Sequence, residues 1–178
     1  VDIVASDGRG GSTTQTVEVT VTGQNDNAPF FTSGDPAPFP ENSQLAAYDA
    51  DADDPDQDTV SFDLKDGKDA ALFSIEQSSG ILNFNAPPDF EDKQDQDSNN
   101  VYEVDIVASD GVNETIKTVA IAVTNENDNG PIFINGLTAS VSFAENGSGT
   151  VYTAQASDAD GTTPTYSLAN GKDRDSFS

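Results

Sequence analysis

Short stretches of alternating apolar and polar residues recur along the whole chain. Residues 17–21 and 102–106 carry Val, Ile or Tyr at every second position, with more polar residues between them. A period of two residues is typical of β-strands with one buried face. Similar apolar stretches predict further strands at residues 60–64, 72–75, 81–84 and 119–123. No segment keeps a helical period over three turns, so we expect an all-β chain.

Turn-forming dipeptides separate the expected strands. They include Asp66-Gly67, Ser79-Gly80 and Asp110-Gly111, in which glycine permits the backbone angles of tight turns. About seven strands in about 100 residues are typical of a Greek-key sandwich of the immunoglobulin type. We therefore expect the fold to consist of immunoglobulin-like β-sandwiches.

The chain contains an internal repeat. Residues 1–8 recur identically as residues 104–111, and the triplet at 25–27 recurs at 127–129. Gly67-Lys68-Asp69 recurs as residues 171–173, so the offset varies only between 102 and 104. A fixed period with small drifts indicates tandem modules with small loop insertions.

The repeat predicts three domains. Residues 1–27 hold the C-terminal strands of a truncated repeat and a linker, residues 28–129 form one complete repeat, and residues 130–178 form the N-terminal half of a further repeat. The expected organisation is one complete sandwich flanked by two partial ones, as in a window of a longer tandem array.

Charge narrows the possible functions. The chain has 32 Asp and Glu residues against 7 Lys and Arg residues, which gives a net charge of −25. This charge excludes nucleic acid as a partner and argues against electrostatic binding to anionic lipid. No apolar run is long enough to insert into a membrane.

Without His or Cys, the chain lacks the usual zinc ligands, thiol nucleophiles and neutral-pH bases. Oxygen ligands suit hard cations such as Ca²⁺, and we expect no enzymatic activity.

The acidic residues gather at turns and strand ends. Calcium takes six to eight oxygen ligands from carboxylates, amides and carbonyls. The linker at 125–129, Asn-Glu-Asn-Asp-Asn, offers all three types within five residues. By contrast, we expect the acidic stretch 92–97 to be solvated surface, since Asp is common in turns.

Five of these clusters, in their order along the chain, resemble the motifs of cadherin repeats. They are Pro40-Glu41-Asn42, Asp54-Pro55-Asp56, Asp89-Phe90-Glu91, Ala108-Ser109-Asp110-Gly111 and Asn125-Glu126-Asn127-Asp128-Asn129-Gly130-Pro131. The long acidic insertion before Val101 looks closest in style to bacterial cadherin-like surface adhesins.

The resemblance implies calcium ions at both junctions between repeats. At the second junction it implies ligands from Glu41, Asp89, Glu91, Asn125, Glu126, Asn127, Asp128, Asn129, Asp158 and Asp160. At the first junction it implies the outermost site only, with ligands from Asn25, Asp26, Asn27, Asp54, Asp56 and Asp110. The family's leading linker aspartate is replaced by Gly23 and Asn125, which predicts a weaker middle ion. Extracellular calcium modules bind at roughly 10⁻⁴ to 10⁻³ M, and we expect this range or slightly weaker binding.

Two functions are consistent with these features. The first is an extracellular or cell-surface adhesion segment that calcium makes rigid, with neighbouring repeats and identical arrays as partners. The alternative is a calcium-dependent carbohydrate-binding module of a bacterial surface or secreted protein, which would bind surface glycans. Its stacking platforms would come from Tyr48, Tyr102, Tyr152 and Tyr166.

Overall fold

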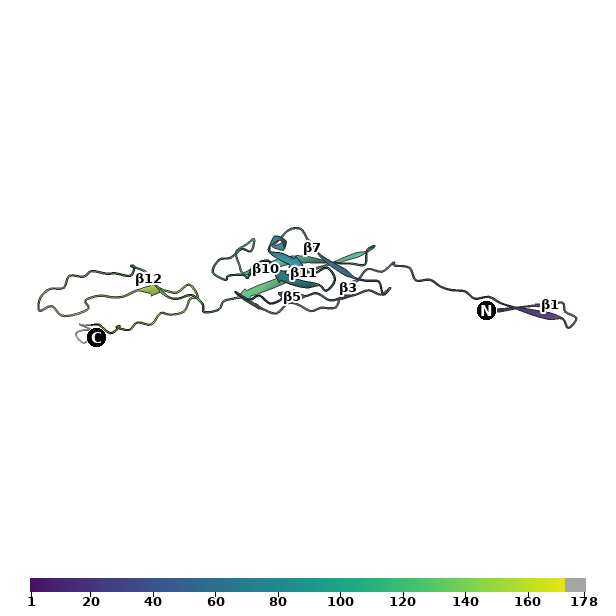
Figure 1. The fold of residues 1–178 in the computed structure, drawn as a ribbon, viewed down its shortest axis with the longest axis horizontal. Coiled ribbons are helices and arrows are strands. Elements are labelled where there is room, and N and C mark those ends of the chain that lie inside the picture. Colours follow the sequence, from purple (N-terminus) through teal and green to yellow (C-terminus); the bar gives the residue numbers. More distant parts are fainter. Residues whose placement is uncertain (172–178) are drawn as a thin grey trace.

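The computed structural model of the chain describes residues 1–171. Residues 172–178 lie outside the described residues. They include the end of the predicted domain 130–178 and two of the three residues of the repeat match at 171–173. The described chain is elongated, with β1 at one end, β12 near the other and a β-sandwich between them (Figure 1).

The described residues form an all-β structure, which confirms the predicted class. The strands are β1 (Asp2–Ser6), β2 (Ser12–Thr16), β3 (Phe30–Phe31), β4 (Phe39–Pro40), β5 (Tyr48–Asp49), β6 (Ala52–Asp53), β7 (Ser61–Lys65), β8 (Phe73–Ile75), β9 (Ile81–Phe84), β10 (Val101–Ser109), β11 (Glu114–Thr124), β12 (Ile132–Phe133) and β13 (Ala156–Ser157). A short 3-10 helix, η1 (Ala70–Leu72), precedes β8. Within residues 1–171, no helix has the length and hydrophobicity needed to cross a bilayer.

Two sheets make the central sandwich. One has the strand order β4-β11-β10-β7, in which β4 runs parallel to β11 and the other neighbours are antiparallel. The other has the order β5-β9-β8, and β3 and β6 form a separate short antiparallel pair. The long hairpin of β10 and β11 holds the first sheet together, with a register from Val101↔Ala122 to Ser109↔Glu114.

The core lies between these sheets. Every second residue of β10 from Tyr102 to Ala108 is buried, and so is every second residue of β11 from Val119 to Val123. The facing sheet contributes Leu82 and Phe73, and the ring of Phe73 lies 4.3 Å from that of Phe84 between centroids. Burying one such side chain stabilises the fold by about 1.5–3 kcal/mol. The alternating pattern of the sequence is therefore the pattern of this core.

One predicted strand is wrong. Strand β2 ends at Thr16, and residues 17–21 form no strand although their apolar pattern is regular. The corresponding residues of β11 pair with the first residues of β10, from Val101 onward. In the described residues, the register of β1 and β2 ends at Asp2↔Thr16, so residues 17–21 have no strand neighbour. Alternation therefore marks a face suited to burial, but a strand also requires a neighbour.

The acidic stretch before β10 is only partly solvated surface. Asp95 is 4% exposed, and its carboxylate accepts the backbone N–H groups of Asn99 and Asn100. Burial raises the pKa of Asp95, but the N–H of Asn99, the side chain of Asp97 and the N–H of Asn100 together hold the pKa below its ordinary value. Asp69 is also buried and accepts the N–H groups of Gln96 and Glu103. Buried carboxylates thus hold this loop against the sandwich, because a desolvated charge needs hydrogen-bond donors.

Candidate metal centres at two junctions

Carboxylates from three separate segments meet at the end of the sandwich where β11 leaves it. Glu41 follows β4, Glu91 lies in the loop between β9 and β10, and Asp128 lies in the linker after β11. One carboxylate oxygen of each lies within 4.8 Å of the others. The structure therefore brings together three of the predicted ligands of the second junction.

Glu41 is fixed in this cluster by two backbone groups. Its Oε2 accepts the N–H of Phe90 at 2.8 Å, and its Oε1 accepts the N–H of Glu126 at 2.7 Å. The side chain is 3% exposed. Glu41 thus joins the end of β4 to both the 85–100 loop and the linker, and its oxygens still face the other carboxylates.

The amide of Asn129 lies among the carboxylates of the second junction. Its Nδ2 donates to Asp128 Oδ1 at 2.8 Å, Asp160 Oδ1 at 3.0 Å and Glu91 Oε2 at 3.2 Å. Its backbone N–H also donates to Asp160 Oδ2 at 2.8 Å. A group with partial positive charge is therefore held where several negative oxygens converge, and Asp160 of the following segment joins the cluster.

The other predicted ligands of this junction lie around the same cluster. Asp89 Oδ1 accepts the N–H of Glu91, and Asp158 Oδ1 accepts the N–H of Asp160. Asn125 Nδ2 donates to Glu91 Oε1 at 2.9 Å, and the carbonyl of Glu126 accepts the N–H of Asp128. Asn127 is an exposed residue of the same linker.

The carboxylates of the second junction repel one another. The pKa of Glu91 is raised, first by loss of solvation and then by the charges of Glu41, Asp160 and Asp89. The pKa of Asp128 is raised by the same causes in the same order. A cation placed among these groups would relieve this repulsion.

The first junction gathers a second acidic cluster at the opposite end of the sandwich. Carboxylate oxygens of Asp54, Asp56 and Asp58 lie within 4.8 Å of one another, although Asp58 was not among the predicted ligands. Asp56 accepts the backbone N–H groups of Asp26 and Asn27 and the side-chain amide of Asn27. The linker is thereby tied to the loop after β6.

Asp54 leaves one carboxylate oxygen without a donor. Its Oδ1 accepts the N–H groups of Asp56 and Asp58. Its Oδ2 is buried and has no hydrogen-bond partner. A buried acceptor without a partner is costly, and a cation ligated at this oxygen would satisfy it.

The sequence analysis did not predict that two asparagines contact the ligands of these sites. Asn113 Nδ2 donates to Asn25 Oδ1 at 3.1 Å, to the carbonyl of Asn27 at 3.2 Å and to Asp110 Oδ2 at 3.3 Å. At the second junction, Asn42 Nδ2 donates to Asp128 Oδ2 at 2.6 Å. Asn42 lies inside the motif Pro40-Glu41-Asn42 and Asn113 lies shortly after the motif aspartate, but neither position is enough to predict the contact.

N–H donors stabilise the ionised carboxylates of the first junction. The pKa of Asp56 is lowered chiefly by the backbone N–H of Asn27. The pKa of Asp110 is lowered chiefly by the backbone N–H of Asn113. Both junctions offer only oxygen ligands of the types that calcium takes. The buried Asp54 Oδ2, which has no hydrogen-bond partner, indicates that the first junction fits a cation.

Comparison with known proteins identifies the repeats. No family model matches the chain. Mouse protocadherin-16 is 34% identical over 138 residues, which cover 73% of this chain and 4% of that protein. Human protocadherin-20 is 32% identical over 145 residues, covering 76% of this chain and 14% of that protein. Dachsous of Drosophila melanogaster is 29% identical over 129 residues, covering 68% of this chain and 4% of that protein. This is a cadherin repeat protein.

Solved cadherin structures share its fold. Repeats EC1-3 of mouse protocadherin-24 superpose with a TM-score of 0.66 at 23% identity, covering 89% of this chain and 55% of that one. The EC3-6 cis-dimer structure of protocadherin gammaB7 gives 0.63 at 21% identity, covering 83% of this chain and 39% of that one. The central sandwich is thus of the cadherin type.

Cadherin repeats are non-enzymatic extracellular modules, which confirms the expectations of no catalysis and of an extracellular or cell-surface location. The expected closeness to bacterial surface adhesins is wrong, since the relatives named above come from mouse, human and fruit fly. The acidic insertion before Val101, on which that expectation was based, has a structural role, because Asp95 holds the loop in place. The chain spans only a small part of these relatives.

Proposed function

We propose that the chain is a calcium-binding segment of an extracellular adhesion protein, in which calcium fixes the angle between successive repeats. The repeats have the predicted limits 1–27, 28–129 and 130–178. The observation that carries the proposal is the convergence of Glu41, Glu91 and Asp128 from three segments within 4.8 Å. A cation would stabilise such a set at neutral pH, because it attracts all three carboxylates at once.

The chain's own residues would hold the cations as follows. At the second junction, Glu41, Asp89, Glu91 and Asp128 supply oxygens from the complete repeat and its linker. Asp158 and Asp160 supply oxygens from the following segment. At the first junction, Asp54, Asp56 and Asp110 supply carboxylates, and Asn25 and Asn27 supply amide or carbonyl oxygens.

Rigidity is the expected consequence. Without cations, repulsion among carboxylates of successive segments favours a flexible linker. A bound cation attracts both sides at once and restricts the linker to one geometry. A stiff rod can present a distal binding region or align with an identical array. The cis-dimer seen for protocadherin gammaB7 supports the second possibility for this chain.

Small-angle scattering of the full chain tests the proposal. In saturating calcium we expect a longer and better-defined maximum dimension than in chelator, with bound calcium counted by calorimetry. Asp128→Asn is the matched variant, since it keeps the shape of the side chain and removes one charge. An unchanged maximum dimension together with no heat of calcium binding would refute the proposal.

The carbohydrate-binding alternative is less well supported. Tyr48 and Tyr102 are buried in the core and offer no stacking face. Tyr152 and Tyr166 are exposed, but they correspond in the repeat to Tyr48 and Phe62, which are core residues. A failure to sediment with insoluble polysaccharide in calcium is the expected result.

A further inference from the structure

The side-chain amide of Asn129 contacts all three parts of the second junction. Its Nδ2 lies 3.2 Å from Glu91 Oε2 in the complete repeat, 2.8 Å from Asp128 Oδ1 in the linker and 3.0 Å from Asp160 Oδ1 in the following segment. The opposite orientation of the amide would place its carbonyl oxygen against these three carboxylates, so the surrounding charges keep the donating nitrogen in this position. One side chain therefore bridges the complete repeat and the segment that follows it.

Two further amides donate to the same carboxylates. Asn42 Nδ2 donates to Asp128 Oδ2 at 2.6 Å, and Asn125 Nδ2 donates to Glu91 Oε1 at 2.9 Å. Asp128 and Glu91 thus each lie between two amides, one of which is that of Asn129. Hydrogen bonds to an ionised acceptor contribute more to stability than bonds between neutral groups. Of the three amides, that of Asn129 is the one that extends this network to the following segment.

The first junction repeats the contacts of this amide with the linker and with the repeat that follows. Asn27 Nδ2 donates to Asp26 Oδ1 and to Asp56 Oδ1, both at 3.0 Å, and its backbone N–H donates to Asp56 Oδ2 at 2.9 Å. Asn129 makes the three corresponding bonds at 2.8, 3.0 and 2.8 Å. The arrangement is therefore a property of the repeat, and it is present where the following repeat is complete.

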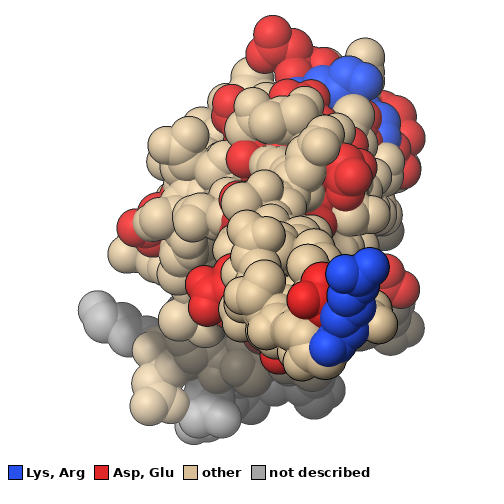
Figure 2. All heavy atoms as spheres, turned by 90° about the vertical axis from the view of Figure 1, so that its right-hand side faces the viewer, with Lys and Arg blue, Asp and Glu red and all other residues tan. Residues whose placement is uncertain are grey.

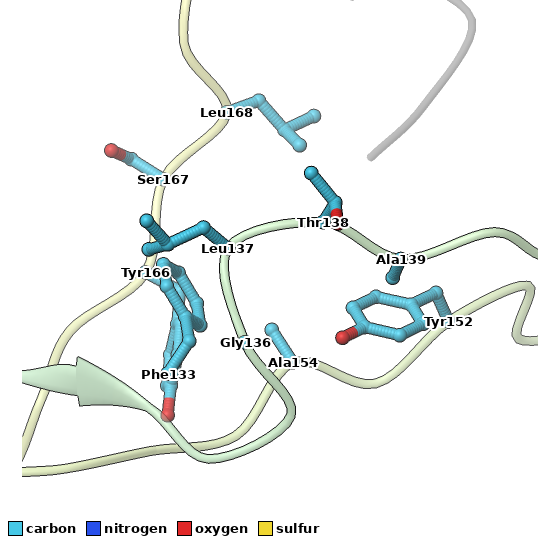
Figure 3. A pocket seen from close by; sticks show the side chains of 10 residues that line it. All are labelled: Phe133, Gly136, Leu137, Thr138, Ala139, Tyr152, Ala154, Tyr166, Ser167 and Leu168. Carbon is cyan, nitrogen blue, oxygen red and sulfur yellow. The ribbon is translucent and has the colours of Figure 1, made fainter.

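The segment that carries Asp160 has the local structure of the complete repeat. Strand β12 pairs with β13 as β3 pairs with β6. The ring of Tyr166 lies beside that of Phe133 (Figure 3), and their centroids are 6.4 Å apart, as are those of Phe31 and Phe62. The loop after β13 therefore presents its aspartate to the linker as the loop after β6 does.

We propose that the amide of Asn129 clamps the second junction when no cation is bound and competes with calcium for its carboxylates. The competition rests on the proposed calcium function, whereas the clamp does not. An amide carries only partial charge, so the clamp narrows the range of linker geometries without fixing a single one. Calcium takes oxygens at about 2.3–2.6 Å, and three of those it would take are the oxygens that accept from Asn129.

The clamp sets the calcium concentration at which the junction becomes rigid. A ligand that binds only one of two forms of a site has an apparent affinity reduced by the fraction of the competing form. The clamped form holds three ligand oxygens in hydrogen bonds, so calcium must first displace the amide. Asn129 thus lowers the affinity of the junction while it limits the mobility of the linker.

NMR of the full chain in chelator tests the clamp without any contribution from calcium. The side-chain amide hydrogens of Asn129 should be protected from exchange with water. In Asn129→Ala, which keeps the backbone N–H bond to Asp160, backbone order parameters of residues 125–130 should fall from about 0.85 toward about 0.6. Asn125→Ala is the matched variant, because it removes an amide that donates to Glu91 but does not contact the following segment. It should loosen the linker less.

Calorimetric titration with calcium measures the competition. Asn129→Ala should bind calcium at the second junction at least about threefold more tightly than the unaltered chain. Residue 129 is exposed, so circular dichroism should show unchanged folding. Linker order in chelator that is equal in Asn129→Ala and the unaltered chain overturns the clamp, and equal or weaker calcium binding in Asn129→Ala overturns the competition. A chain without any heat of calcium binding would overturn the proposed function and the competition together, while the measurements in chelator still decide the clamp.

Discussion

The two junctions of this chain treat their carboxylates in opposite ways. At the first junction, backbone N–H groups and the amides of Asn27 and Asn113 donate to Asp56 and Asp110, and the pKa of both carboxyls is lowered. At the second junction, Glu91 and Asp128 face other carboxylates, and the pKa of both is raised. Donors of the protein reach the carboxylates of both junctions, but only at the second do lost solvation and neighbouring carboxylates outweigh them, at Glu91 and Asp128.

This difference indicates which of the two junctions should depend more on a bound cation. Acidic side chains are spread along the sequence and over the end face in Figure 2, and within residues 1–171 only Glu103 and Asp105 form ion pairs with a basic side chain. Charge density alone therefore does not define a site. Carboxylates whose mutual repulsion outweighs their hydrogen-bond donors are a sharper sign, and Glu41, Glu91 and Asp128 form such a group. Calcium should act more strongly on the second junction than on the first.

The largest expected effect is on stability and follows from Glu41→Ala. The substitution leaves the N–H groups of Phe90 and Glu126 without their acceptor. An unsatisfied, partly buried donor costs about 1–3 kcal/mol, and relief of the repulsion on Glu91 and Asp128 offsets part of this cost, so we expect the free energy of unfolding to fall by about 1–3 kcal/mol. Urea denaturation in chelator measures this loss without a contribution from calcium.

Two controls separate this effect from the general loss of a charge. Glu41→Gln keeps one carbonyl oxygen as an acceptor and should lose less stability than Glu41→Ala. Asp56→Ala at the first junction removes contacts on an exposed loop and should have a much smaller effect. Equal urea midpoints for Glu41→Ala and the unaltered chain would show that Glu41 does not hold the junction together.

The next largest effect concerns calcium affinity and uses a matched pair of substitutions. Asp128 and Asp26 occupy the same position of the repeat, but Asp128 clusters with Glu41 and Glu91, whereas Asp26 belongs to neither carboxylate cluster of residues 1–171. Asp128→Asn should weaken binding at the second junction at least about tenfold, because affinity follows the number of charged ligands. Asp26→Asn should change the calorimetric titration much less. Equal losses for both substitutions would contradict the difference between the junctions.

Much of this comparison could be predicted from the sequence, and the reason is the repeat. Repetition at a fixed offset locates Glu41, Asp54 and Asp128 relative to the strands, and a period of two locates the core of β10. The side chains that donate hydrogen bonds to the linkers could not be predicted. Asn113, for example, donates to the carbonyl of Asn27, which is 86 residues away in the sequence. The missing strand at residues 17–21 has a similar cause, since pairing depends on a partner that local pattern does not report.

The pH dependence of the two junctions should have opposite signs. A raised carboxyl pKa means that the folded state binds more protons than the unfolded state, so the contribution of Glu91 and Asp128 to stability decreases as pH rises through their folded pKa. A lowered pKa means the reverse. The contribution of Asp56 and Asp110 is present above the ordinary carboxyl range and is lost as pH falls through their lowered pKa.

Side-chain carboxyl NMR in chelator measures these four groups directly. Glu91 and Asp128 should titrate above their ordinary values, and Asp56 and Asp110 should titrate below theirs. Adding calcium should lower the apparent pKa of Asp128, because the cation and the proton compete for the same oxygens. The same titration midpoint at both junctions would remove the electrostatic basis of the comparison.

The smallest expected effect comes from Asn113→Ala and has an unusual sign. The amide of Asn113 donates to Asn25 Oδ1, the carbonyl of Asn27 and Asp110 Oδ2, all of which belong to predicted calcium ligands. An incoming cation must displace this amide before it can take those oxygens. Removing the amide should therefore make the first linker more mobile in chelator, by NMR relaxation, while calcium binding at that junction becomes about twofold tighter. Weaker binding in Asn113→Ala would instead mean that the amide orders the ligands for calcium, and the donors of the first junction would then assist the cation that they were inferred to replace.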